Sequence, residues 1–118
     1  MSLLNSLYHI TSADGQGKYE VSFDPGHSIF AGHFPGNPIV PGACLVQIAE
    51  ELLSQYLEQP IQWTNIHNLK FRQIVTPDLP VVFVLTPQEN NKCSVLINYL
   101  DNPHAQFTAT YLCAHSNL

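Results

Sequence analysis

The stretch Gly32–Leu57, GHFPGNPIVPGACLVQIAEELLSQYL, consists of two parts with opposite backbone properties. The first part carries prolines at positions 35, 38 and 41, interleaved with glycines. Because proline fixes φ and glycine reaches conformations closed to other residues, this spacing predicts a stiff extended segment rather than a flexible loop. In the second part apolar residues recur at helical spacing, and no proline or glycine follows until Pro60. The pattern predicts a helix from about Gly42 to Leu57, with an apolar stripe formed by Leu45, Ile48, Ala49, Leu52, Leu53 and Tyr56.

This junction also predicts a functional site. His33 is the only histidine inside the rigid segment, and Gly42 stands where the helix begins. The first backbone N–H groups of a helix have no intrahelical partner and point toward whatever docks against them. A rigidly held imidazole next to an open helix start is therefore a candidate site for a ligand or a reaction.

The rest of the chain is typical of strands joined by turns. Apolar and polar residues alternate over residues 18–23, 69–75, 93–99 and 105–113, and residues 81–85 form a continuous apolar run. Residues 3–10 fit either a strand or a short helix. Strands grouped apart from one long helix indicate an α+β fold in a single domain over residues 1–118. We expect a curved antiparallel sheet wrapped around the central helix, with a sheet edge available for pairing to a second subunit.

Composition narrows the classes of function. The formal net charge is −5, with four Lys and Arg residues, which argues against nucleic acid as a partner. No segment is long and apolar enough for a membrane span, and the start of the chain lacks the features of a signal peptide. The three cysteines form no CxxC pair and predict reduced thiols in a cytoplasmic protein. With only 11% charged residues, the chain is expected to hide part of its surface in an oligomer.

Two motifs resemble those of a known family. Residues 33–42, HFPGNPIVPG, resemble the HFPGxPxxPG signature of the hot-dog-fold 3-hydroxyacyl-[acyl-carrier-protein] dehydratases. Residues 70–78, KFRQIVTPD, are similar to the KFRxPVxPGD strand of the same family, except that the glycine is missing and Pro77 directly precedes Asp78. The order of elements also agrees, so the resemblance covers nearly the whole chain and implies the hot-dog fold.

The resemblance implies a role for several residues. His33 would remove the α-proton of a 3-hydroxyacyl thioester, and the backbone N–H of Gly42 would bind the thioester carbonyl. The position of the acid that protonates the departing hydroxyl holds Gln47, whose amide cannot deliver a proton at neutral pH. Glu51 lies four residues later on the same helix face, so it is a candidate to supply the proton directly or through a water held by Gln47. Further substrate contacts are implied for Phe34, Pro41 and Ala43.

The implied reaction is dehydration of a 3-hydroxyacyl thioester of acyl carrier protein or coenzyme A to the trans-2-enoyl product, in fatty-acid or related acyl-chain synthesis. It needs no metal or organic cofactor, because β-elimination requires only proton transfers and carbonyl polarisation. The histidines also lack metal-ligand spacing. The site would lie between the subunits of a homodimer. Lys70 and Arg72 are either a docking spot for an acidic carrier protein or two solvated charges.

Two alternatives remain open at this point. A hot-dog acyl thioesterase would use Glu51 and Gln47 to hold an attacking water. A non-catalytic acyl-thioester binder, or a subunit that stabilises an active relative in a heteromer, would explain the glutamine at the acid position. Two further residues have plainer interpretations: Glu50 is expected to be a solvated helix residue, and Cys44 a small buried hydrophobe rather than an activated thiol.

Overall fold

A computed structural model describes residues 2–31 and 36–113 of the chain. The described part contains six strands, one α-helix and one short 3-10 helix. Two strands, β1 (Tyr8–Ala13) and β2 (Lys18–Phe23), precede the 3-10 helix η1 (Ser28–Phe30) and the long helix α1 (Gly42–Leu57). Four strands follow: β3 (Ile61–Phe71), β4 (Val81–Gln88), β5 (Lys92–Tyr99) and β6 (Asn102–Cys113).

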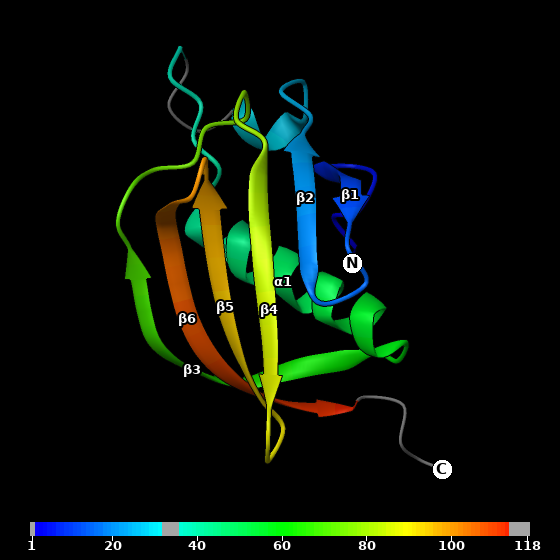
Figure 1. The fold of residues 1–118 in the computed structure, drawn as a ribbon. Helices are drawn as coiled ribbons and strands as arrows, with labels where there is room; N and C mark the ends of the chain where they lie inside the picture. Colours follow the sequence, from blue (N-terminus) through cyan, green and yellow to red (C-terminus); the bar gives the residue numbers. More distant parts are fainter. Residues whose placement is uncertain (1, 32–35, 114–118) are drawn as a thin grey trace.

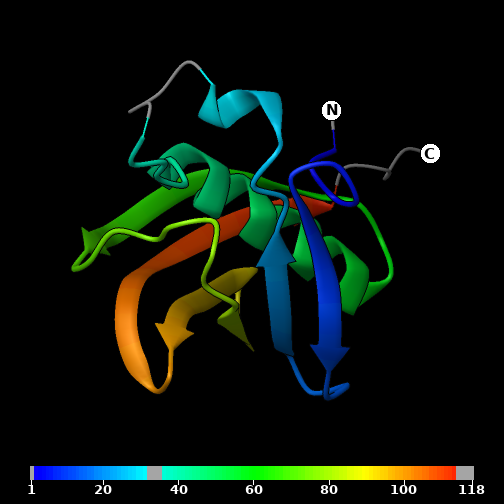
Figure 2. The ribbon, with the colours of Figure 1, turned by 90° about the horizontal axis from the view of Figure 1, so that it is seen from above.

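The six strands form one antiparallel sheet in the order β1-β2-β4-β5-β6-β3. Helix α1 lies across one face of the sheet (Figure 1). The view from above shows the long strands β3 and β6 curving around α1 (Figure 2). This arrangement confirms the predicted α+β class and the curved sheet around a central helix. β1 and β3 are the two edge strands.

The core fills the space between α1 and the concave face of the sheet. Alternate residues of β4, β5 and β6 are buried, as period-2 patterning requires for strands with one face on a core. The buried residues of the helix are Leu45, Ile48, Ala49, Leu52 and Leu53, all on the predicted apolar stripe. The largest fully buried side chains include Tyr8, Phe83, Leu7, Ile97 and Val21, so the N-terminal residues belong to the same core.

Residues 14–17 form a tight turn between β1 and β2. The Asp14 carboxylate accepts the backbone N–H groups of Gln16 and Lys18 at 2.8 and 3.0 Å. Gly17 has a φ of +94°, and a Cβ at this position would collide with the carbonyl of Leu85 on β4. Glycine is therefore required here both for the conformation and for the close approach of β2 to β4.

The extent of one strand differs from the prediction. β3 begins at Ile61 and ends at Phe71, whereas alternation indicated a strand over residues 69–75. Its register against β6 shifts between Trp63 and Asn65 and again between His67 and Lys70. Each irregularity interrupts the two-residue period, so the pattern hides the first half of the strand. Residues 72–75 instead leave the sheet and turn toward β4.

Candidate active site at the start of helix α1

The helix start has the open geometry that the sequence predicts. Pro41 is the N-cap residue, with φ −60° and ψ 145°, and it supplies no side-chain cap. The carbonyl of Pro41 accepts the N–H groups of Cys44 and Leu45 at 2.9 and 3.2 Å, which closes the first turn. The N–H groups of Gly42 and Ala43 lie at the very start of the helix and have no intrahelical acceptor. No acidic residue lies in the first turn. This end of α1 is therefore suited to bind a carbonyl or an anion.

The ring of Phe71 lies directly against Gly42. A Cβ built on Gly42 would stand 2.5 Å from Phe71 Cζ and 3.0 Å from both Cε atoms. Glycine at this position is thus explained by an aromatic ring from β3 rather than by the backbone angle. Phe71 is 52% exposed, so it forms a solvent-accessible wall of the site.

A cleft of about 410 Å³ opens at this point, between the start of α1 and the segment that follows β3. A volume of this size is within the range of small-molecule sites. Most of its wall is apolar, and Arg72 and Gln73 add polar groups. Pro41 and Gly42, two of the predicted substrate contacts, line this cleft together with Phe71. Its lining consists of Ile39, Val40, Pro41, Gly42, Leu45, Phe71, Arg72, Gln73, Ile74 and Val75.

Gln47 and Glu51 lie together on one face of α1, as their spacing predicts. Both are half-buried, and Gln47 Nε2 donates a hydrogen bond of 3.1 Å to Glu51 Oε2. The same carboxylate also accepts the backbone N–H groups of Leu3 and Leu4 and the hydroxyl of Tyr8. The sequence did not indicate this contact between the N-terminal residues and the helix. The catalytic roles of Gln47 and Glu51 remain predictions.

Of the predicted site residues, His33 and Phe34 lie outside the described residues, which resume at Gly36. Ala43 is exposed in the first turn of α1. Glu50, expected to be solvated, is half-buried and accepts the backbone N–H of Trp63 at 2.9 Å. Glu50 therefore attaches β3 to the helix. The sequence does not predict this role, because it depends on how β3 packs against α1.

The three cysteines form no disulfide; Cys93 is buried, and Cys44 and Cys113 are half-buried. Burial raises the pKa of the Cys44 thiol, although Cys44 lies in the first helical turn, where the helix dipole would lower it. Burial also raises the pKa of Cys93 to about 11. The raised pKa of the half-buried Cys44 thiol does not favour an activated thiol.

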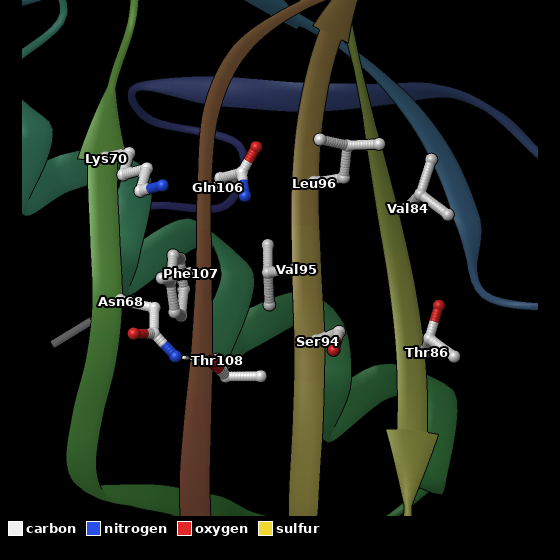
Figure 3. A pocket seen from close by; sticks show the side chains of 10 residues that line it. All are labelled: Asn68, Lys70, Val84, Thr86, Ser94, Val95, Leu96, Gln106, Phe107 and Thr108. Atoms are coloured by element: carbon white, nitrogen blue, oxygen red, sulfur yellow. Dashed lines mark hydrogen bonds between the residues drawn. The ribbon is translucent and has the colours of Figure 1, made fainter.

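Lys70 and Arg72 both lie beside Gln106 of β6 but line different hollows. Lys70 lines a polar hollow of about 570 Å³ on the face of the sheet away from α1, where it lies beside Gln106 (Figure 3). Arg72 lines the cleft at the start of α1 and makes two long hydrogen bonds of 3.4 Å to Gln106 Oε1. Arg72 is therefore the cationic residue placed at the candidate site.

Within residues 2–31 and 36–113, no three His, Cys, Asp or Glu side chains gather as a metal site. None of the helices in the described part of the chain is long and apolar enough to cross a membrane.

The curved sheet around one central helix defines a hot-dog fold, and the cleft at the helix start is its candidate active site. The chain belongs to the ApeI-like dehydratase family, whose sequence model matches residues 9–109. The match includes the start of α1 and the end of β3.

Curated relatives at the sequence level are 3-hydroxyacyl-[acyl-carrier-protein] dehydratases named FabZ. The protein of Legionella pneumophila is 35% identical over 60 residues, covering 42% of this chain and 40% of the relative. The protein of Pediococcus pentosaceus is 30% identical over 96 residues, covering 65% of this chain and 62% of the relative. The matches thus span 40% and 62% of the length of these two relatives.

Solved structures share the fold. The dehydratase heterocomplex ApeI:P from Xenorhabdus doucetiae superposes with a TM-score of 0.72 at 18% identity, covering 85% of this chain and 91% of that chain. A mutant of thioesterase PA1618 from Pseudomonas aeruginosa superposes with a TM-score of 0.57 at 15% identity, covering 88% of this chain and 78% of that chain. At these identities the likeness establishes the hot-dog fold alone.

Proposed function

We propose that this protein is a 3-hydroxyacyl-thioester dehydratase that acts on substrates carried by acyl carrier protein or coenzyme A. The observation that carries the proposal is the uncapped start of α1, which opens into an apolar cleft of about 410 Å³ directly after the His33–Gly42 motif. Membership of the ApeI-like dehydratase family supports the reaction class. The proposal keeps the cytoplasmic location that the number and spacing of the cysteines predict.

In the proposed reaction the N–H of Gly42 polarises the thioester carbonyl, which makes the α-proton more acidic. The imidazole of His33 removes this proton, the C–O bond at the β-carbon breaks, and the double bond forms between the α- and β-carbons. The departing hydroxide takes up one proton to become water, so the products are a trans-2-enoyl thioester and water. The Gln47 amide cannot supply that proton; the proton that His33 took from the α-carbon passes to the hydroxide through a water molecule held beside Gln47, which leaves His33 neutral for the next turnover.

The test of the proposal is an assay of the native chain with a 3-hydroxyacyl thioester. An enoyl thioester as product supports the dehydratase. Release of the free thiol would instead identify a thioesterase. Binding without turnover would identify a non-catalytic subunit.

We expect Gln47→Glu to raise the dehydration rate. The introduced carboxyl would lie next to the Glu51 carboxylate, because Gln47 Nε2 and Glu51 Oε2 are 3.1 Å apart. A neighbouring negative charge raises the pKa of a carboxyl group and favours the protonated form that a general acid needs. A general acid contributes on the order of 10²–10⁴ in rate, so a gain of about 10-fold or more in kcat is expected. An unchanged kcat would mean that the proton is already supplied efficiently.

We also propose a homodimer paired along β3. β3 is an edge strand, and apolar side chains along and after it are exposed: Ile66, Leu69, Phe71 and Ile74. An unpaired strand edge with apolar side chains is a surface that proteins normally cover. A second copy would cover it and would also close the cleft beside Phe71, where the site is open in one chain.

The dimer proposal predicts a molar mass of twice 13.2 kDa in light scattering. Leu69→Lys should shift the protein toward the monomer, because it places a charge in the proposed interface. Leu100→Lys is the control, since Leu100 is 75% exposed on the turn between β5 and β6. A native monomer, or equal effects of both substitutions, would contradict pairing along β3. A requirement for a second, different chain would indicate a heteromer, as in the ApeI:P complex.

A further inference from the structure

We propose that Glu51 is a positioning residue, which fastens the N-terminal turn to α1 and holds the amide of Gln47 in one orientation. The N-terminal turn is defined as residues 3–8. The effect on turnover rests on the proposed dehydratase function, whereas the effect on the Gln47 amide does not. In this assignment Glu51 acts through Gln47 and is not itself the acid.

The N-terminal turn is closed on itself and joined to the core. The carbonyl of Leu3 accepts the N–H groups of Ser6 and Leu7 at 3.1 and 2.8 Å. Leu7 is fully buried and Tyr8 is 1% exposed. The turn therefore has a fixed place against the core. The N–H of Leu3 needs an acceptor from elsewhere in the protein, whereas the N–H of Leu4 also donates to the neighbouring Ser2 hydroxyl at 3.2 Å.

Glu51 supplies that acceptor from a helix more than forty residues away in the sequence. Its Oε2 accepts the N–H of Leu3 at 2.8 Å, and its Oε1 accepts the N–H of Leu4 at 3.0 Å. The Tyr8 hydroxyl donates to Oε1 at 3.0 Å, and the Ser2 hydroxyl approaches the same oxygen at 3.4 Å. Burial raises the pKa of the Tyr8 phenol, and the charge of Glu51 raises it further, so Tyr8 keeps the proton that it donates.

These contacts fit an anchor better than a general acid. With the donation from Gln47, both carboxylate oxygens of Glu51 accept hydrogen bonds, and every partner is a donor. A proton placed on either oxygen would compete with one of these donors. A residue that delivers a proton in each turnover must carry one first, so each cycle would disturb the attachment of the N-terminal turn.

The hydrogen bond between Gln47 and Glu51 also decides which end of the amide faces the carboxylate. An ionised carboxylate only accepts, so Gln47 must turn Nε2 toward Glu51 and its oxygen away. The N-terminal turn thereby influences the side chain at the position of the family's acid, although none of its residues belongs to the helix. Loosening the turn should therefore disturb the site through Gln47.

The kinetic test is a cycle of Glu51→Gln and Gln47→Ala, measured as kcat per folded protein. We expect Glu51→Gln to lower kcat about 5-fold in the native background, the effect of one lost hydrogen bond. In the Gln47→Ala background it should have no further effect, because the two residues act as one unit. Glu50→Gln is the matched control: the neighbouring carboxylate accepts a backbone N–H of β3 and makes no bond to Gln47.

Two kinetic outcomes would overturn the proposal. A loss of about 10²–10⁴ in both backgrounds would identify Glu51 as the general acid. A lowered Tm with kcat unchanged in both backgrounds would leave Glu51 a purely structural role.

A second measurement is independent of turnover and of the stability of Glu51→Gln. Tyr8→Phe removes one donor to Glu51 and keeps the buried ring. In ¹⁵N NMR we expect the side-chain amide protons of Gln47 to exchange faster with water in Tyr8→Phe than in the native chain, and to be unchanged in Glu50→Gln. Unchanged exchange in Tyr8→Phe would contradict the coupling. The expected NMR effect in a protein without dehydration activity would reject the proposed function and retain the positioning role.

Discussion

His33→Ala is expected to lower kcat for dehydration by a factor on the order of 10²–10⁴, the contribution of a positioned general base. Without the imidazole no other residue of the motif can remove the α-proton, because Phe34, Pro35 and Asn37 carry no basic group. The acid side of the pH profile of kcat/KM should also disappear, since it reports protonation of the base. Substrate binding should change little, because the base acts mainly in the transition state.

The measurement is steady-state dehydration by purified His33→Ala, with thermal unfolding as a check on folding. His9→Ala serves as the control, since His9 is an exposed histidine of β1. If His33→Ala keeps full activity with an intact fold, the proposed base is wrong and the family resemblance does not extend to its chemistry.

Gly42→Ala is expected to reduce activity far more than stability. The added methyl group would lie 2.5 Å from Phe71 Cζ and would push the ring toward the cleft. Because the ring is the end of a half-exposed side chain, it can move at small cost to the fold. The displaced ring would misplace the thioester relative to the Gly42 N–H, and a displacement of about 1 Å can cost roughly 10²-fold in rate.

The double substitution Gly42→Ala with Phe71→Ala distinguishes a loss caused by the collision with Phe71 from a loss caused by the methyl group itself. Removal of the ring should restore part of the activity if the collision is responsible. Gly26→Ala is the control, because Gly26 lies in a turn before η1 and a Cβ there meets only the Asp24 carboxylate at 3.3 Å. Full activity in Gly42→Ala would mean that the start of α1 does not bind the thioester.

Much of the fold was predictable because local chemistry marks its boundaries. The helix begins at Gly42, directly after the proline-rich segment, and ends at Leu57, shortly before Pro60, as the sequence predicts. Strands β2, β5 and β6 follow their alternation closely. β3 was predicted only in part, since its two register shifts against β6 break the pattern of alternation from which strands are recognised.

The candidate site was predictable to a smaller extent. The motif indicates Gly42 and the helix start, and the four-residue spacing correctly places Gln47 beside Glu51. The other partners are tertiary contacts: Phe71 reaches Gly42 from β3, and the amides of Leu3 and Leu4 reach Glu51 from the N-terminus. No local pattern encodes contacts between residues so far apart, so the chemistry around Glu51 became visible only in the folded chain.

The placement of β2 next to β4 has a consequence for how the chain assembles. The ladder between them runs only from Lys18 and Val84 to Val21 and Val81, and all of α1 and β3 lies between the two strands in the sequence. The other strand neighbours β4, β5 and β6 are joined by short turns and can pair early. Docking of the β1–β2 hairpin onto β4 must instead close a loop of about sixty residues, and pairing of β3 with β6 is also long-range, so the entropic cost of completing the sheet is concentrated in these two steps.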